Sequence, residues 1–297
     1  MCPILKSTLS LGGLLCVSGL ATSLSAAINI TGFDPLVNDR FANDASFIAS
    51  GFDLSGVAIA DDGRWITMLS SNVFVTANHF ASPVNTSVTF YNSNDPLGGS
   101  FNTTIQSSQQ LGGTDIQLGV LSTALPTSYN AYDLFNDPIP PNSNPVALAM
   151  FGRSPSAFPG SQDMAIGQNV LDTFTANQNV SGNTGDAGSA TFDSPGDPFF
   201  LAYEAQLAVG DSGAPVMVND DGELTIIGVN WYIGTTTDDP AQEVSGFSYL
   251  PNYISDIDAF ILANDITPFP EPITSALLIG LVIASTTLSR RRRSVQI

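Results

Sequence analysis

Cysteine, histidine and basic residues are scarce in this chain of 297 residues. Its two cysteines, Cys2 and Cys16, both lie near the start, and His79 is the only histidine. Beyond residue 16 no intrachain disulfide can form, and one histidine without cysteine does not make a zinc site. Acidic turns are frequent, but none has a complete EF-hand pattern. The sequence therefore predicts no metal and no cofactor.

The few basic residues are also unevenly placed. Five of the 8 lysines and arginines lie at the two ends, at Lys6 and in the run 290–293. Residues 28–267 hold three basic residues and 26 acidic ones, a formal charge of −23. Because such a body repels polyanions, the sequence excludes nucleic acid as a partner. The 240 residues of this body are enough to bury a core without disulfides.

Residues 1–27 predict a signal peptide. They combine Lys6, an apolar stretch and the small residues Ser25–Ala27, which favour cleavage directly after this run. Lipidation at Cys16 is a weaker alternative, because a large leucine precedes it where a small residue is preferred. We therefore expect an exported chain that starts at Ile28.

The other end of the chain resembles a sorting signal. Ile273–Ser289 is a run of 17 residues without a charge, and four arginines follow it directly. This pattern predicts a short membrane span with the arginines in the cytoplasm, rather than a buried helix. Pro270-Glu271-Pro272 stands just before the run. Together, residues 268–297 resemble the PEP-CTERM sorting signal of Gram-negative bacteria.

That resemblance implies a route out of the cell. An exosortase-type enzyme would process the chain near the Pro-Glu-Pro triplet. The membrane would hold the protein transiently, through the apolar run, before this cut. We therefore expect the protein at the cell surface or outside a Gram-negative cell.

The body between the two ends is predicted to be all-β. Short runs rich in β-branched and aromatic residues alternate with Asn, Asp, Gly and Pro. These runs are 57–59, 65–68, 73–76, 87–91, 146–151, 214–218, 224–231 and 247–249. Asp62-Gly63 and Asp221-Gly222 each stand between two such runs, which predicts two hairpins.

Three further segments of the body have other patterns. Residues 253–264 place apolar side chains on one helical face, which predicts a C-terminal helix. Residues 136–145 contain four prolines, and we expect them to link two halves of the body. Residues 176–198 are rich in Gly, Asn, Ser and Asp and are expected to form a long surface loop.

Three short motifs carry candidate chemistry. His79 ends an apolar run, and Asp115 lies within an apolar segment. Ser212 stands between glycines in a tight loop that can aim backbone N–H groups at one point. Each motif alone has an ordinary alternative: a structural histidine, a strand-end aspartate or a simple turn. A buried carboxylate needs a partner, however, and a histidine ring would serve.

Taken in this order, the three contexts resemble the chymotrypsin-like serine peptidases. Thr-Ala-x-His at 76–79, Asp-Ile-x-Leu at 115–118 and Gly-Asp-Ser-Gly-x-Pro at 210–215 are similar to the family's three catalytic motifs. Residues 227–231 resemble its cleft strand, and residues 246–257 its closing strand and helix. The resemblance spans about residues 55–264.

The resemblance implies a fold. Two six-stranded Greek-key β-barrels would occupy residues 55–140 and 141–267, and a C-terminal helix would end the second. An N-terminal segment, residues 28–54, would precede them. The catalytic cleft would lie between the barrels.

The resemblance also implies a reaction. His79, Asp115 and Ser212 would form a triad that hydrolyses peptide bonds of protein or peptide substrates through an acyl-enzyme. The backbone N–H groups of Gly210 and Ser212 would bind the oxyanion. This makes the chain a serine-type endopeptidase, and two other functions stay open. One is an inactive relative that binds peptides or surface polymers, and the other is an adhesive surface protein in which the motifs coincide by chance.

Four further residues would shape the cleft. Gln206 would lie at the base of the specificity pocket, where an acid would be needed to pair with arginine or lysine. Asn230 stands where the family has a serine that supports the catalytic aspartate. Trp231 and Tyr232 follow, and Tyr232 occupies a position at which glycine would leave the pocket open. We therefore expect cleavage after small or medium apolar residues.

Activation is the last expectation. Family members often pair a newly freed isoleucine or valine amine with the aspartate that precedes the catalytic serine. Removal of the signal peptide would free Ile28 to pair with Asp211. Otherwise, internal hydrogen bonds must satisfy the Asp211 carboxylate.

Overall fold

The computed structural model describes residues 27–136, 146–157, 162–237 and 241–265. The expected signal peptide up to residue 26, most of the expected linker and the apolar run before the arginines lie outside these ranges. No helix within the described ranges is long and apolar enough to cross a membrane. The prediction of an all-β chain with two Greek-key barrels and a C-terminal helix is confirmed.

The first barrel is a six-stranded antiparallel sheet. Its strands are β2 (Val57–Ile59), β3 (Trp65–Met68), β4 (Val73–Ala77), β5 (Ser87–Tyr91), β6 (Ser100–Gln110) and β7 (Ile116–Leu121). They lie in the order β2-β3-β4-β7-β6-β5, which is a Greek key because β7 returns to pair with β4. A bridge between Ala60 and Val88 joins the two edges of the sheet.

The second barrel is a seven-stranded antiparallel sheet. Its strands are β8 (Val146–Arg153), β9 (Met164–Leu171), β10 (Thr173–Val180), β11 (Asn183–Thr191), β13 (Pro215–Asp220), β14 (Glu223–Thr235) and β15 (Glu243–Tyr249). Their order is β10-β11-β15-β14-β13-β8-β9. Only Asp172 separates β9, which pairs with β8, from β10, which pairs with β11. Strands β9 and β10 can therefore be counted as one bent strand, which gives the second barrel six strands.

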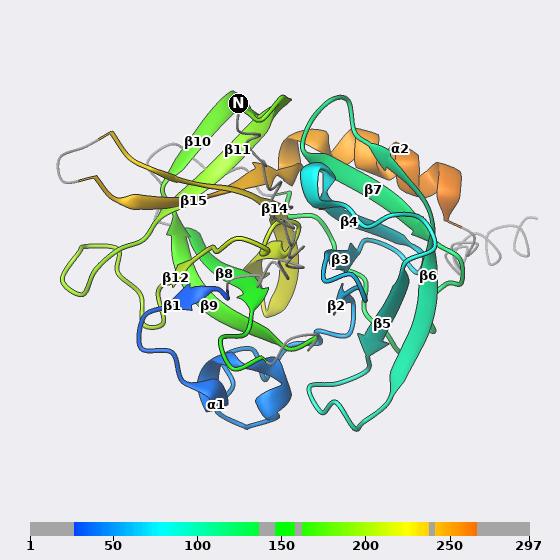
Figure 1. Ribbon diagram of the computed structural model, residues 1–297, viewed down its shortest axis with the longest axis horizontal. Coiled ribbons are helices and arrows are strands. Elements are labelled where there is room, and N and C mark those ends of the chain that lie inside the picture. Colours follow the sequence, from blue (N-terminus) through cyan, green and yellow to red (C-terminus); the bar gives the residue numbers. More distant parts are fainter. Residues whose placement is uncertain (1–26, 137–145, 158–161, 238–240, 266–297) are drawn as a thin grey trace, which may run out of the picture.

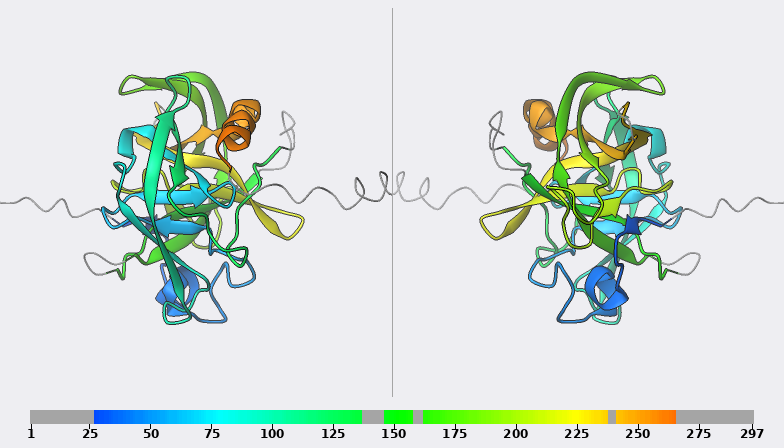
Figure 2. Two further views of the ribbon diagram at one scale, coloured as in Figure 1. Left: turned by 90° about the vertical axis from the view of Figure 1, so that its right-hand side faces the viewer. Right: turned by 90° about the vertical axis from the view of Figure 1, so that its left-hand side faces the viewer.

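The remaining elements are short. They are β1 (Asn29–Ile30), β12 (Ala205–Gln206), the helices α1 (Pro35–Asn38) and α2 (Ile254–Asn264), and the 3-10 turns η1 (Arg40–Ala42), η2 (Asn78–Phe80) and η3 (Leu250–Tyr253). Figure 1 shows the second sheet at the left, the first at the right and α2 at the top. In the side views of Figure 2, α2 lies on the outside of the molecule.

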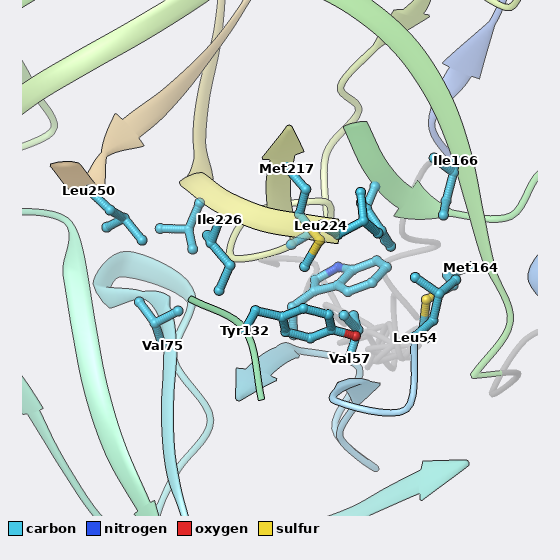
Figure 3. Packing of buried hydrophobic residues seen from close by; sticks show 14 of the residues in the cluster. Leu54, Val57, Val75, Tyr132, Met164, Ile166, Met217, Leu224, Ile226 and Leu250 are labelled. Carbon is cyan, nitrogen blue, oxygen red and sulfur yellow. The ribbon is translucent and has the colours of Figure 1, made fainter. Parts of the chain in front are cut away.

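The core explains why several strands are continuous apolar runs. Successive residues of a strand point to opposite faces, and both faces of β4 are buried. Phe74 packs inside the first sheet, and Val75 packs in a cluster shared by the two sheets. In Figure 3, Val57 and Val75 from the first sheet meet Met217 and Ile226 from the second. This shared core fixes the two sheets against each other.

The N-terminal segment ties the two sheets together. Its strand β1 pairs with β12 on the second-sheet side, with Asn29 opposite Gln206. Further on, the fully buried Arg40 donates to the carbonyl oxygens of Val57 at 3.2 Å and Tyr91 at 3.1 Å on the first sheet. The segment therefore crosses from one barrel to the other.

The structure confirms some of the elements predicted from local sequence patterns and contradicts one of them. The two Asp-Gly hairpins are confirmed between β2 and β3 and between β13 and β14, where Asp221 and Gly222 both have positive φ. The predicted C-terminal helix is confirmed, with Ile257 fully buried. The surface loop expected over 176–198 is wrong, because this stretch contains β11 and the end of β10. Its glycines pack instead: a Cβ on Gly188 would lie 2.4 Å from the ring of Phe247.

Candidate active site

Strand pairing in the first sheet brings His79 and Asp115 together. Strands β4 and β7 are antiparallel, and Ala77 lies opposite Ile116. His79 follows β4 in the turn η2, and Asp115 directly precedes β7, so both stand at the same end of this pair. The backbone N–H of Asn78 donates to the carbonyl oxygen of Asp115 at 2.9 Å, which extends the pairing to the two residues.

Three side chains form a continuous hydrogen-bonded series. The Oδ2 atom of Asp115 lies 2.7 Å from Nδ1 of His79, and Nε2 of the same ring lies 2.9 Å from Oγ of Ser212. The Asp115 side chain is fully buried, whereas the His79 side chain is 34% exposed. A buried acceptor on Nδ1 leaves Nε2 free to accept a proton from the serine hydroxyl. The structure thus joins the three predicted catalytic residues.

Residues of the first sheet hold the loop that carries Ser212 from one side. The indole N–H of Trp65, in the first sheet, donates to the carbonyl oxygen of Gly210 at 3.2 Å. Gly213 has φ +86°, and a Cβ there would lie 2.4 Å from Oγ1 of Thr76. Both facts require glycine at this position. The Gly-Asp-Ser-Gly sequence therefore fits its loop for a steric reason.

Alternate backbone N–H groups of the serine loop are free. The N–H of Asp211 donates to Ala208, and that of Gly213 donates to Asn230. Among the described residues, no protein acceptor is found for the N–H groups of Gly210 and Ser212. These are the two groups expected to bind an oxyanion, and they remain available for a ligand.

Asp115 has a partner that the sequence did not indicate. Nδ2 of Asn183, the first residue of β11, donates to Oδ1 of Asp115 at 2.8 Å. The backbone N–H of His79 donates to the same oxygen at 2.9 Å. Asn183 lies in the stretch expected to be a loop, and no local motif marks it.

The residue expected to support Asp115 lies elsewhere. Asn230 is fully buried, and its amide donates to the carbonyl oxygens of Phe151 at 3.0 Å and Asp211 at 3.2 Å. It also pairs with Ala214 through its backbone. Its side chain therefore holds the serine loop on β8 and does not contact the catalytic aspartate.

The other expected cleft residues lie at two places. Gln206 is half-buried in β12 and accepts a hydrogen bond from Asn29 at 3.2 Å. Trp231 is buried, and the half-buried Tyr232 follows it in β14. A Cβ on Gly246 would lie 2.2 Å from the ring of Tyr232, so this ring fills the space beside Gly246.

Asp211 is a second fully buried aspartate next to the triad. Its Oδ1 accepts from the backbone N–H of Arg153 and its Oδ2 from that of Ala208, both at 2.8 Å. Burial raises the pKa of this carboxyl to about 7, although the two hydrogen bonds and the charge of Arg153 act in the opposite direction.

Ile28 lies beside this carboxyl. It is fully buried, and its backbone N–H donates to the carbonyl oxygen of Arg153 at 3.1 Å. A Cβ on Gly152 would lie 2.5 Å from Cβ of Ile28 and 2.8 Å from Cγ of Asp211, so both side chains pack on Gly152. The fold thus brings together the two residues of the expected activation pair.

Metal ligands do not gather at the site or elsewhere in the described part of the chain, where no group of three His, Cys, Asp or Glu side chains is placed to hold an ion. Comparison with protein-family models gives no match, and comparison with curated proteins gives none either. The functional interpretation therefore depends on the sequence motifs and the geometry.

Proposed function

We propose that this protein is a serine endopeptidase. The observation that supports this function is the series of hydrogen bonds from Asp115 through His79 to Ser212. His79 and Ser212 are 133 positions apart, and they lie next to strands of different sheets, β4 and β13. A buried carboxylate, an imidazole and a hydroxyl in this order are the parts needed for nucleophilic acyl transfer.

The geometry suggests the course of the reaction. Oγ of Ser212 attacks the peptide carbonyl carbon while Nε2 of His79 takes the hydroxyl proton. Asp115 stabilises the resulting imidazolium, and the N–H groups of Gly210 and Ser212 bind the oxyanion. The C–N bond breaks as His79 returns the proton to the leaving amine. Water then hydrolyses the acyl-enzyme, with His79 again as the base.

Reaction with a fluorophosphonate probe tests this proposal. We expect the purified protein to be labelled, and labelling to be lost in Ser212→Ala and His79→Ala, because the probe reacts only with an activated serine. Ser107→Ala, a change at an exposed serine of β6, serves as the matched control and should label like the wild type. A folded wild type that does not react would favour the inactive, peptide-binding relative instead.

We also propose a preference for small or medium apolar residues before the cleaved bond. The Tyr232 ring beside Gly246 supports it, because this ring takes space that a large substrate side chain would need. Tyr232→Gly should raise kcat/KM for phenylalanine relative to alanine substrates by about tenfold or more. Tyr232→Phe keeps the ring and should leave the ratio unchanged. Rapid cleavage after arginine or lysine by the wild type would contradict the preference.

Export is the third part of the proposal. The expected signal peptide and the segment 268–297 support secretion, processing by an exosortase-type enzyme and transient anchoring in the inner membrane. The charge of −23 on residues 28–267 suits a protein exposed to salty surroundings. Fractionation of producing cells tests this part, and protein retained in the cytoplasm would contradict it.

A further inference from the structure

A side chain from the second sheet completes the surroundings of the catalytic aspartate in the first. Asn183 donates to Oδ1 of Asp115 at 2.8 Å, and the backbone N–H of His79 donates to the same atom at 2.9 Å. Two donors on one carboxylate oxygen fix the rotation of the carboxylate. The other oxygen, Oδ2, then faces Nδ1 of the His79 ring.

The amide of Asn183 is itself held in one orientation. Its Oδ1 accepts from Nε2 of Gln110 at 3.1 Å and from Nδ2 of Asn78 at 3.3 Å. Gln110 also donates to the carbonyl oxygen of Thr114 at 2.8 Å. Because an amide oxygen accepts and an amide nitrogen donates, two donors on the oxygen direct the nitrogen toward Asp115.

Backbone contacts hold the tip of the β10–β11 hairpin against the first sheet. The N–H of Thr184 donates to the carbonyl oxygen of Gly113 at 3.1 Å. A Cβ on Gly185 would lie 3.3 Å from Cβ of Thr114, so β11 closely approaches the turn between β6 and β7. In addition, the N–H of Asp186 donates to the hydroxyl oxygen of Tyr253 at 2.9 Å. The hairpin therefore presents Asn183 from a fixed position.

We propose that Asn183 is a positioning residue of the triad, which fixes the carboxylate of Asp115 and, through it, the ring of His79. The side chain of Asn230 does not supply this contact, because its amide donates to Phe151 and Asp211. The inference rests on the proposed function, since it assigns Asn183 to that site. The β10–β11 hairpin of the second barrel thus supplies a residue that supports Asp115 and His79, the two triad residues of the first barrel.

Two substitutions and a matched control test the role of Asn183. Asn183→Ala removes the donor, and Asn183→Asp keeps the shape but puts a second carboxylate against Oδ1 of Asp115. Asn179→Ala is the control, because Asn179 lies in the same hairpin and donates to Oγ1 of Thr184 at 2.6 Å, away from the triad. We expect the fluorophosphonate labelling rate to fall about tenfold to a hundredfold in both Asn183 variants, and to be unchanged in the control.

A second readout does not depend on catalysis. Because His79 is the only histidine, protein labelled with ¹⁵N in histidine gives the NMR signals of a single imidazole. The Nδ1 proton is sensitive to its hydrogen bond with Asp115. We expect its signal to shift or broaden in both Asn183 variants and to stay in place in Asn179→Ala. An Nδ1 signal and a labelling rate equal to those of the wild type in Asn183→Ala would overturn the proposal.

The two readouts separate the failure of this inference from the failure of the proposed function. If the wild type does not react with the probe but Asn183→Ala moves the Nδ1 signal, the peptidase function fails and the positioning role stands. If the wild type reacts and neither readout changes in the variants, the positioning role fails alone. Should Asn183→Ala not fold, the isosteric Asn183→Asp decides, and the proposal then requires its Nδ1 signal to differ from that of the wild type.

Discussion

Two fully buried aspartates lie at the site, Asp115 within the triad and Asp211 directly before Ser212, and their surroundings differ. Asp115 accepts hydrogen bonds from a backbone N–H and from Asn183, and it also faces the His79 ring, which can carry a positive charge. Asp211 accepts two backbone N–H groups of the described residues, and burial raises its pKa to about 7. The first carboxylate therefore has a partner that would become a cation in the proposed reaction, and the second has no such partner among the described residues.

This difference indicates how each of the two buried carboxylates, Asp115 and Asp211, is stabilised. A buried carboxylate costs free energy unless a charge or enough hydrogen bonds compensate it. At Asp115 both carboxylate oxygens have partners, two donors on Oδ1 and the His79 ring at Oδ2. At Asp211 a proton or a further cation would improve the compensation, and the α-amino group of a chain that starts at Ile28 would be such a cation.

The largest expected effect comes from removing the charge of Asp115. Asp115→Asn should lower kcat by about 10⁴-fold with little change of KM, because the imidazolium of His79 loses its stabilising carboxylate and the ring its correct tautomer. Asp256→Asn, at an exposed position of α2, is the control and should keep full activity. A loss of less than tenfold in Asp115→Asn would mean that the aspartate is not part of a working triad.

The next effect concerns Asp211 and the start of the chain. In a protein that begins at Ile28, the α-amino group belongs to a residue whose side chain packs with Asp211 on Gly152, whereas one extra residue before Ile28 makes this nitrogen a neutral peptide group. We expect the extended form to lose activity by about a hundredfold or more, because the Asp211 loop also carries Ser212. Full labelling of the extended form by the fluorophosphonate probe would rule out the pairing.

The sequence predicts those features of the fold and the site that a short local motif marks. His79, Asp115 and Ser212 were identified because each stands in a short motif, and Asp-Gly pairs marked two hairpins because this dipeptide favours a tight turn, with positive φ at Gly63, Asp221 and Gly222. The all-β class followed from runs of β-branched residues in the same way.

The sequence does not predict contacts between residues that are far apart in the chain. Strand β11 was expected to be a loop because its glycines and polar residues have low strand propensity, yet those glycines admit rings such as that of Phe247. Asn183 and Asn230 are the same residue type, and nothing local shows which of them reaches Asp115. The choice depends on how the β10–β11 hairpin packs on the first sheet.

The smallest expected effect is a pH dependence of stability at Asp211. Its pKa rises from 3.8 to about 7 on folding, so between these values the native state binds more protons than the unfolded state. The free energy of unfolding should therefore fall as pH rises from about 4 to 7, by at most about 1.4 kcal/mol per pH unit for this group. Asp211→Asn should reduce the slope in denaturant titrations and Asp256→Asn should not, while Glu204 and Asp163, whose pKa values burial raises to about 7 and about 6, keep their contribution in both variants. A free amine at Ile28 that pairs with Asp211 would lower the pKa of this carboxyl, so the slope should be smaller in the chain that starts there than in the extended one. Equal slopes in the wild type and Asp211→Asn would show that Asp211 is already compensated and that the two aspartates do not differ.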